Sequence, residues 1–373
     1  MGSSTEDRGS SDQGLLVTWG CEDAPTHQAQ THMALARHAA ELLRRRFGGR
    51  LEDAAGGDGA HYCIPRSTLF AENGAAVFGA AGPDPARFFG GWVPAGLLAT
   101  KAIVHPLAPG ETPPEGWPAG FAAAACDVAL VGASAFTLKG AAQAGRRLLD
   151  RGPVRIKAVG ASGGVGQFVA RSQDELDRVL ERAAEIGLLD GGLVLEEHLE
   201  NVKTYSVGEV MLGDLHAAYV GTQDLTSNNA GEEVYGGSRL FVVRGGYPEL
   251  LKLVPPEVAK LCAMAMRFDQ LAERELGLVA SRRNYDIIVG TDHAGEQRSA
   301  VLEQSWRVGG ASPAELAALE VFDRDPARRH VIAASVERYG AAAVLPENAR
   351  LYFHGTDAEV GPILKYASVQ DAP

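Results

Sequence analysis

The chain has 373 residues, a formal net charge of −12, 46% hydrophobic residues and 22% charged residues. This composition is typical of a globular protein with more than one packed unit, and the negative charge argues against nonspecific nucleic-acid binding through a broad basic surface. No apolar run has the length of a membrane-spanning helix, and the polar beginning MGSSTEDRGSSDQG does not resemble a secretion signal. The four cysteines form no CxxC pair, so we expect no zinc knuckle and no disulfide framework. A cytoplasmic protein without membrane or nucleic-acid partners is the expectation.

The N-terminal part of the chain has the pattern of an α/β unit, over residues 14–98. Before it, residues 1–13 are predicted to be a disordered tail. LLVTW (Leu15 to Trp19) is a strand-like apolar run, and a helical pattern follows from about His27 to Phe47. HYCIP and AAVFGA are further strand candidates. The proline-rich stretch from His105 to Gly120 then predicts an extended surface connection.

From Asp127 onward, strand and helix patterns alternate more regularly. DVALVGASAF and PVRIKAV are strand-like, and LKGAAQAGRRLLDRG between them is helical. Ser172 and Glu175 have the spacing of a capping box, and apolar residues repeat at helical intervals after them. The next helix is therefore predicted to begin near Gln173.

The glycine-rich segment GASGGVG between PVRIKAV and this helix admits two functional interpretations. A dinucleotide-binding turn needs its helix directly after the glycines, because the pyrophosphate binds the first free N–H groups of the helix. Here QFVARS separates Gly166 from the helix, and QFVA alternates as a strand does. A glycine-rich hairpin that covers phosphates fits better, with Lys157 supplying a positive charge just before the loop. A tight turn without a ligand is the simpler alternative for these glycines alone.

Two later strands carry carboxylates that could hold a metal ion. NYDIIVG places Asp286 in an apolar strand, where an ionised carboxylate is costly unless it is paired, metal-bound or at a water-facing edge. AVLEQSWRV places Glu303, Ser305 and Arg307 at alternate positions, so their side chains share one face. Magnesium prefers oxygen ligands and commonly binds one or two carboxylates together with substrate phosphates. Asp286 and Glu303 satisfy this requirement.

In this order, the motifs resemble those of the ATP-grasp superfamily. GGLVLEEHLE is similar to the strand and hinge that contact adenine, and AVLEQSWRV is similar to the E-x-N-x-R strand, with Ser305 in place of the asparagine. The resemblance implies a mixed α/β and α+β fold, in which an N-terminal α/β domain precedes two α+β subdomains that enclose a nucleotide. The subdomains are expected at 99–192 and 193–320, and residues 321–373 form a C-terminal extension without an assignment.

The resemblance also implies roles for individual residues. For ATP, they are Lys101, Lys157, Gly160, Ser162, Gly163, Gly164, Gly166, Glu196, Glu197 and Leu199, with Lys139 as a rival of Lys101. For Mg2+, they are Asp286, Glu303 and Ser305, and for catalysis they are Arg307, Lys157 and Arg283, the last as the holder of a substrate carboxylate. Lys203 and Thr204 occupy the region where the superfamily often has a glutamate for the ribose. The N-terminal histidines, among them His105, lack the spacing of metal ligands.

Most members of the superfamily are ligases, so the resemblance implies an ATP- and Mg2+-dependent enzyme that activates a small-molecule carboxylate as an acyl phosphate for attack by an amine. The turn-rich segment from Thr226 to Gly246 is expected to face the substrate, because loops on a rigid scaffold commonly confer specificity. A homodimer is one option that the superfamily offers. The alternatives are a small-molecule kinase, a nucleotide-binding protein without turnover and, last, a nicotinamide-dependent dehydrogenase.

Overall fold

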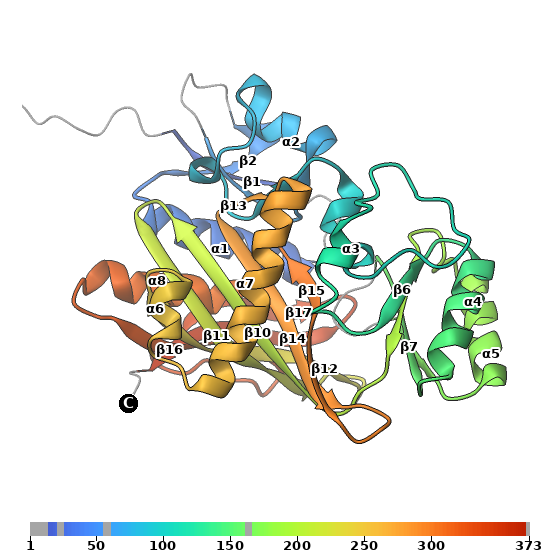
Figure 1. Cartoon of the computed structure of the whole chain (residues 1–373). Coiled ribbons are helices and arrows are strands. Elements are labelled where there is room, and N and C mark those ends of the chain that lie inside the picture. The colour runs from blue at the N-terminus through green and yellow to red at the C-terminus, as the bar shows by residue number, and fades with distance from the viewer. Residues whose placement is uncertain (1–13, 21–25, 55–60, 161–165, 371–373) are drawn as a thin grey trace, which may run out of the picture.

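The computed structural model describes residues 14–20, 26–54, 61–160 and 166–370 (Figure 1). The predicted tail, residues 1–13, lies outside the described residues, as do Ser162, Gly163 and Gly164 of the glycine-rich loop. None of the helices in the described ranges is long and apolar enough to cross a membrane.

The N-terminal part folds as a small α/β unit. Strand β1 (Leu16–Trp19) lies between β2 (Phe47–Arg50) and β3 (Tyr62–Pro65), and both neighbours run parallel to it. Helix α1 (Thr26–Leu42) packs against these strands through its buried apolar side. The helix is shorter than its sequence predicts, because Arg44 adopts a φ of 54° and the chain then enters β2. The predicted order of strand and helix is nevertheless confirmed.

One predicted strand of this unit is a helix. HYCIP forms β3 as expected, but AAVFGA lies largely in α2 (Ala71–Phe78). The Asn73 side chain accepts the N–H of Phe70 at 2.7 Å and so caps the beginning of this helix. Alanine also favours a helix more than a strand, and these local preferences outweigh the short apolar run on which the strand prediction depended.

A connecting region joins this unit to the rest of the chain. Its strands β4 (Leu69–Phe70) and β5 (Gly91–Val93) pair with β13 (Val279–Ala280) in the order β13-β5-β4. Its single helical turns are η2 (Gly79–Ala81), η3 (Pro85–Arg87), η4 (Gly96–Ala99), η5 (Lys101–Val104) and α3 (Phe121–Ala124), whereas η1 (Leu51–Asp53) lies between β2 and β3 in the N-terminal unit. The proline-rich stretch between η5 and α3 is an irregular connection, as predicted.

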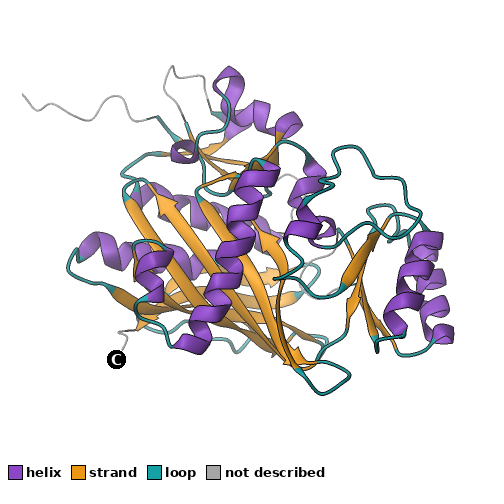
Figure 2. Ribbon diagram, viewed as in Figure 1, coloured by secondary structure: helices purple, strands orange, loops and turns teal. Residues whose placement is uncertain are grey.

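The first predicted subdomain is a four-stranded antiparallel sheet with two helices on one face (Figure 2). Its strands lie in the order β6 (Gly132–Ala135), β9 (Leu193–Glu197), β7 (Val154–Ala158) and β8 (Gln167–Ala170). The helices are α4 (Leu138–Leu149) and α5 (Gln173–Glu185). Ser172 Oγ accepts the N–H of Glu175 at 3.3 Å, so the helix begins where the capping box predicts. QFVA forms β8, paired antiparallel with β7, and the predicted hairpin is confirmed.

The largest element is an eight-stranded antiparallel sheet in the order β15-β14-β10-β11-β12-β16-β18-β17. Its strands are β10 (Glu200–Leu212), β11 (Leu215–Ser227), β12 (Glu233–Arg244), β14 (Arg282–Thr291), β15 (Gln297–Ser305), β16 (His330–Tyr339), β17 (Arg350–Asp357) and β18 (Gly361–Gln370). Helices α6 (Tyr247–Leu251) and α7 (Pro256–Leu276) cover one face, and α8 (Ser312–Arg324) covers the other. Figure 1 shows α7 lying across this sheet.

The residues after 320 continue this sheet and also contact the N-terminal helix. The expected boundary at 320 falls inside α8, and β16, β18 and β17 extend the sheet beyond β12. The carboxylate of Asp357, at the end of β17, accepts the backbone N–H of His27 at 3.0 Å and lies 3.1 Å from its Nδ1 atom. The Tyr352 hydroxyl lies 2.7 Å from Nδ1 of His38 in the middle of α1. The last strands therefore complete the hydrophobic core to which the first helix contributes.

Candidate functional site

Two carboxylates lie opposite each other at one edge of the large sheet. Asp286 of β14 and Glu303 of β15 are direct partners in the strand register, and the register shifts immediately after this pair. Both are thus on one face, as the sequence predicts for Glu303. Asp286 Oδ1 accepts hydrogen bonds from Gln223 Nε2 at 2.9 Å, from Asn284 Nδ2 at 3.0 Å and from the Ser206 hydroxyl at 3.3 Å. These neutral donors orient the Asp286 carboxylate without cancelling its charge.

The electrostatics of this pair suit a divalent cation. Burial and the nearby Glu303 charge raise the pKa of Asp286 to about 6, although the hydrogen bonds from its neighbours act to lower this pKa. Two carboxylates that repel each other are stabilised by a shared cation. Within the described residues there is no cluster of three or more His, Cys, Asp or Glu side chains that could hold a metal, which leaves room at the carboxylate pair for phosphate and water oxygens as ligands. That donor set fits Mg2+.

Lys101 reaches the same pair from outside the sheet. It is the first residue of η5, and its Nζ atom lies 2.9 Å from Glu303 Oε2. The rival, Lys139, is exposed on the first turn of α4. The side chain of Gln304, next to Glu303, donates to the Thr100 carbonyl at 2.7 Å and so fastens the η5 segment to β15. The structure therefore brings Lys101, and not Lys139, to the carboxylates.

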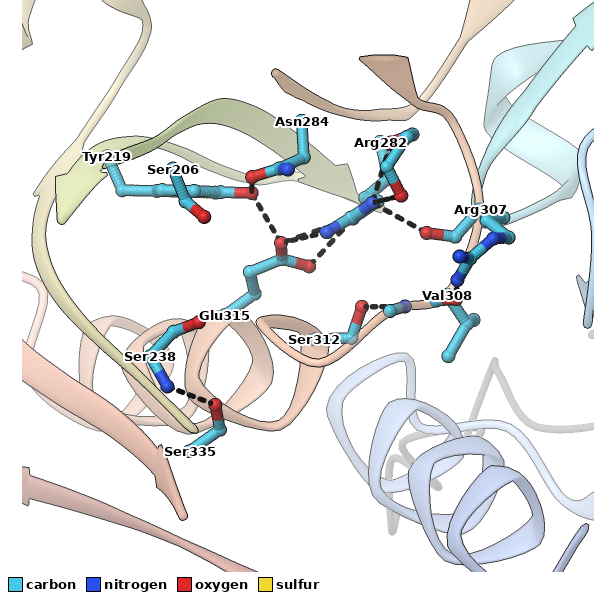
Figure 3. Close-up of polar contacts among 12 residues, drawn as sticks. Ser206, Tyr219, Ser238, Arg282, Asn284, Arg307, Val308, Ser312, Glu315 and Ser335 are labelled. Carbon is cyan, nitrogen blue, oxygen red and sulfur yellow. Dashed lines mark hydrogen bonds and ion pairs between the residues drawn. The ribbon is translucent and has the colours of Figure 1, made fainter. Parts of the chain in front are cut away.

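Arg282 holds the turn that carries Arg307 and lies beside Glu315 (Figure 3). Its guanidinium is fully buried, lies 2.7 Å from Glu315 of α8, and donates to the carbonyl oxygens of Ser305 at 2.8 Å and Arg307 at 2.5 Å. The Ser305 hydroxyl lies 3.4 Å from the same guanidinium. The role of Ser305 as a Mg2+ ligand stays a prediction. Arg307 donates to the carbonyl of Val308 at 2.8 Å.

The prediction that Arg283 holds a substrate carboxylate is wrong. Successive side chains of a strand point to opposite faces, so Arg283 lies on the face of β14 opposite to Asp286. There it pairs with Asp269 at 2.9 Å and Glu273 at 2.6 Å, both on α7. Arg283 holds the long helix on the sheet and is remote from the carboxylate pair.

On the small sheet, Lys157 belongs to a buried charged cluster. Its Nζ atom lies 2.5 Å from Glu196 Oε1, and His105 Nε2 lies 3.1 Å from Glu196 Oε2. Nδ1 of His105 is buried and has no hydrogen-bond partner in the described part of the chain. Burial alone raises the pKa of Glu196, but the Lys157 charge and the His105 hydrogen bond outweigh it and lower the pKa to about 2. Glu196 therefore stays ionised and holds Lys157.

The hinge that follows β9 differs in part from its prediction. Glu197 Oε1 accepts from Val131 N and from Arg298 Nη2, each at 3.1 Å, so this side chain links β9 to β15. Because these two contacts hold the Glu197 side chain, the backbone groups of the hinge are the ones available to contact a nucleotide base. Leu199 is buried, and its N–H has no acceptor among the described residues. A buried donor without a partner is costly, and a ring nitrogen of a bound base could satisfy it.

The glycine-rich loop is described at its two ends. Gly160 follows β7, and Gly166 adopts a φ of 69° before β8. The Ala158 N–H donates to the Gly166 carbonyl at 3.3 Å, which closes the hairpin beside Lys157. The role expected for Gly160 and Gly166 stays a prediction.

Sequence reasoning missed three residues of this site. His105 stands in the proline-rich connection, and nothing in its spacing indicates Glu196 as a partner. Gln223 lies two strands away from Asp286 in the sheet order, so only the register brings the two together. Arg282 is predictable from the sequence, because alternate residues of a strand share one face, and Arg282 therefore lies on the same face as Asp286. Arg283 lies on the opposite face.

The comparisons with known proteins agree with this architecture. The carboxyaminoimidazole ribonucleotide synthase of Aspergillus clavatus, complexed with ATP, aligns over 96% of this chain and 94% of its own, with 12% identity and a TM-score of 0.52. The same enzyme with ADP and 5-aminoimidazole ribonucleotide aligns over 97% and 94%, with the same identity and TM-score. A search of curated proteins found no significant relative.

At this identity, the similarity establishes the fold, which is the ATP-grasp fold. Residues 16–367 match a family model with the description "Protein of unknown function (DUF3182)". The chain therefore belongs to the DUF3182 family and folds as an ATP-grasp protein.

Proposed function

We propose that this protein is an ATP- and Mg2+-dependent ligase that activates a small-molecule carboxylate as an acyl phosphate for attack by an amine. The observation that carries the proposal is the Asp286–Glu303 pair, on one sheet face with Lys101 at 2.9 Å from Glu303. Phosphoryl transfer requires positioning and charge stabilisation and no protein nucleophile, and these residues supply both.

The small sheet provides the second half of the nucleotide site in this proposal. Lys157, held by Glu196, keeps two N–H donors for phosphate oxygens. The N–H of Leu199 would donate to a ring nitrogen of adenine, and a phosphate-binding role for Gly160 and Gly166, at the two ends of the glycine-rich loop, stays a prediction. Glu196 positions Lys157 in this arrangement and does not contact adenine.

The reaction follows from this arrangement. Mg2+ held by Asp286 and Glu303 would offset the charge of the phosphoryl group that is transferred. A carboxylate oxygen of the substrate attacks the γ-phosphorus, the bond to the β–γ bridging oxygen breaks, and ADP leaves. The amine then attacks the acyl carbon, inorganic phosphate leaves, and the amine proton passes to water. Arg307 stabilises the negative charge on the transferring group and on the tetrahedral adduct.

Calorimetric titration of ATP with Mg2+ tests the nucleotide site. We expect binding that depends on Mg2+, that is lost in Lys157→Ala and Asp286→Asn, and that is unchanged in Lys139→Ala, which removes an exposed lysine. Absence of ATP binding by the wild type would refute the proposal.

Release of ADP tests the reaction itself. Mixtures of small carboxylates with amines should stimulate it more than either class alone. A stable phosphorylated product that forms without an amine would show a kinase instead. The cytoplasmic location and the homodimer stay predictions.

A further inference from the structure

The turn that follows β3 is fastened to the turn that carries Arg307. The Trp306 carbonyl accepts the Thr68 hydroxyl at 3.3 Å and the N–H of Gly91 at 2.7 Å. Trp306 immediately precedes Arg307, and Arg66 stands two residues before Thr68 on the turn of the N-terminal unit. Two turns far apart in sequence are therefore held together by one carbonyl oxygen.

Gly90 shows how closely these turns approach each other. A Cβ atom at this glycine would lie 3.2 Å from the Trp306 carbonyl oxygen, 3.9 Å from the Cα atom of Arg307 and 3.9 Å from the Pro65 ring. Gly90 also has a φ of 145°, which disfavours any other residue. The backbone of Arg307 and the residue that precedes Arg66 thus contact the same small space.

The two arginines on these turns lack acidic partners. Arg66 donates to the side-chain oxygen of Gln28 at 2.8 Å, and Arg307 donates to the carbonyl of Val308. Within the ranges that the structure describes, neither guanidinium lies within 4.0 Å of a carboxylate, in contrast to Arg282 with Glu315. Burial, and then the charges of Arg282 and Arg66, lower the pKa of Arg307, whereas the charges of Glu303 and Asp286 act in the opposite direction and do not cancel this effect.

We propose that Arg66 and Arg307 together bind the carboxylate of the substrate, in a site between the N-terminal unit and the end of β15. This inference rests on the ligase function proposed above, and it assigns to Arg66 the task that Arg283 does not perform. A guanidinium matches the two oxygens of a carboxylate, and two guanidinium groups without acidic partners on adjoining turns are stabilised by an anion that reaches both. Arg307 also stands at the turn that follows Glu303, so a carboxylate held there is near the proposed Mg2+ site.

Malonate is the probe for this site, and the full-length protein is the sample. Its dissociation constant is measured by calorimetry at low ionic strength, without nucleotide and again with saturating MgADP. The variants are Arg66→Gln, which removes the charge, and Arg66→Lys, which keeps the charge and loses the planar pair of donors. The matched control is Arg50→Gln, an exposed arginine at the end of β2 in the same unit. MgADP affinity is measured on every sample and also reports that each variant is folded.

We expect Arg66→Gln to weaken malonate binding about tenfold or more, Arg66→Lys to weaken it less, and Arg50→Gln to leave it unchanged, with MgADP affinity preserved throughout. Equal malonate binding by Arg66→Gln and the wild type would overturn the inference, and so would a wild type that binds MgADP but no malonate. Either result leaves the ligase proposal intact. A wild type that binds no MgADP refutes the proposed function, whereas the titrations without nucleotide still decide whether Arg66 binds an anion.

Discussion

Glu196→Gln is the sharpest test of the buried cluster on the small sheet. The substitution keeps the shape of the side chain but leaves the Lys157 ammonium, which is 8% exposed, without its counter-charge. The difference between the ordinary pKa of 4.5 and the value of about 2 for Glu196 corresponds to about 3 kcal/mol of stability at neutral pH. The usual cost of breaking a buried ion pair, about 3–5 kcal/mol, has the same size. We therefore expect Glu196→Gln to lower the free energy of unfolding by about 3 kcal/mol at pH 7.

The dependence on pH has a definite sign. Because folding lowers the pKa of Glu196, the stabilisation is complete above pH 4.5 and is lost as the pH falls from 4.5 toward 2. Urea unfolding at pH 7 and pH 3 should show a difference between wild type and variant that shrinks by about half at pH 3. Glu185→Gln, at an exposed ion pair with Arg182, is the control and should change stability little.

A double variant separates the ion pair from other effects. Glu196→Gln with Lys157→Met removes both charges, so it should be more stable than Glu196→Gln alone. The reasoning is refuted if Glu196→Gln costs less than about 1 kcal/mol at pH 7, or if its cost is the same at both pH values.

Three further predictions concern the carboxylate edge, the helix face and the connection. Arg283→Met should lower the free energy of unfolding by about 3 kcal/mol, because it leaves the Asp269 carboxylate without its ion-pair partner. The same variant should bind ATP with unchanged affinity in calorimetry. A loss of ATP affinity without a loss of stability would contradict this prediction. MgATP affinity of the wild type should weaken below about pH 6, as Asp286 becomes protonated, and a flat profile between pH 5.5 and 7.5 would contradict this assignment. His105→Ala should raise the KM for ATP about tenfold and change kcat less, whereas His105→Gln, which keeps a donor for Glu196, should restore most of the affinity; equal effects of both would indicate a packing role only.

Local signals in the sequence predict local structure well in this chain. The capping box at Ser172 marks the beginning of α5, and the alternation of QFVA separates a hairpin from a dinucleotide turn. The error at AAVFGA is also local, because six residues are too few to distinguish a buried strand from a helix. The sheet face on which Glu303 lies can be predicted, because parity along one strand decides which face a side chain takes.

The parts of the site that depend on distant pairing could not be predicted. Gln223 reaches Asp286 only through the register of β10, β11 and β14, and His105 meets Glu196 only after the connection folds back along β6. For the same reason, the strands after residue 320 had no assignment, since their pairing partner β12 lies far away in the sequence.

The docking of β17 on α1 has a consequence for the synthesis of this protein. Helix α1 is synthesised long before β17, which supplies Tyr352 for His38 and Asp357 for the N–H of His27. Until β17 is synthesised, the part of α1 that it covers stays exposed, and exposed apolar surfaces attract chaperones and promote aggregation. A stop codon upstream of β17 would therefore harm a unit near the opposite end of the polypeptide.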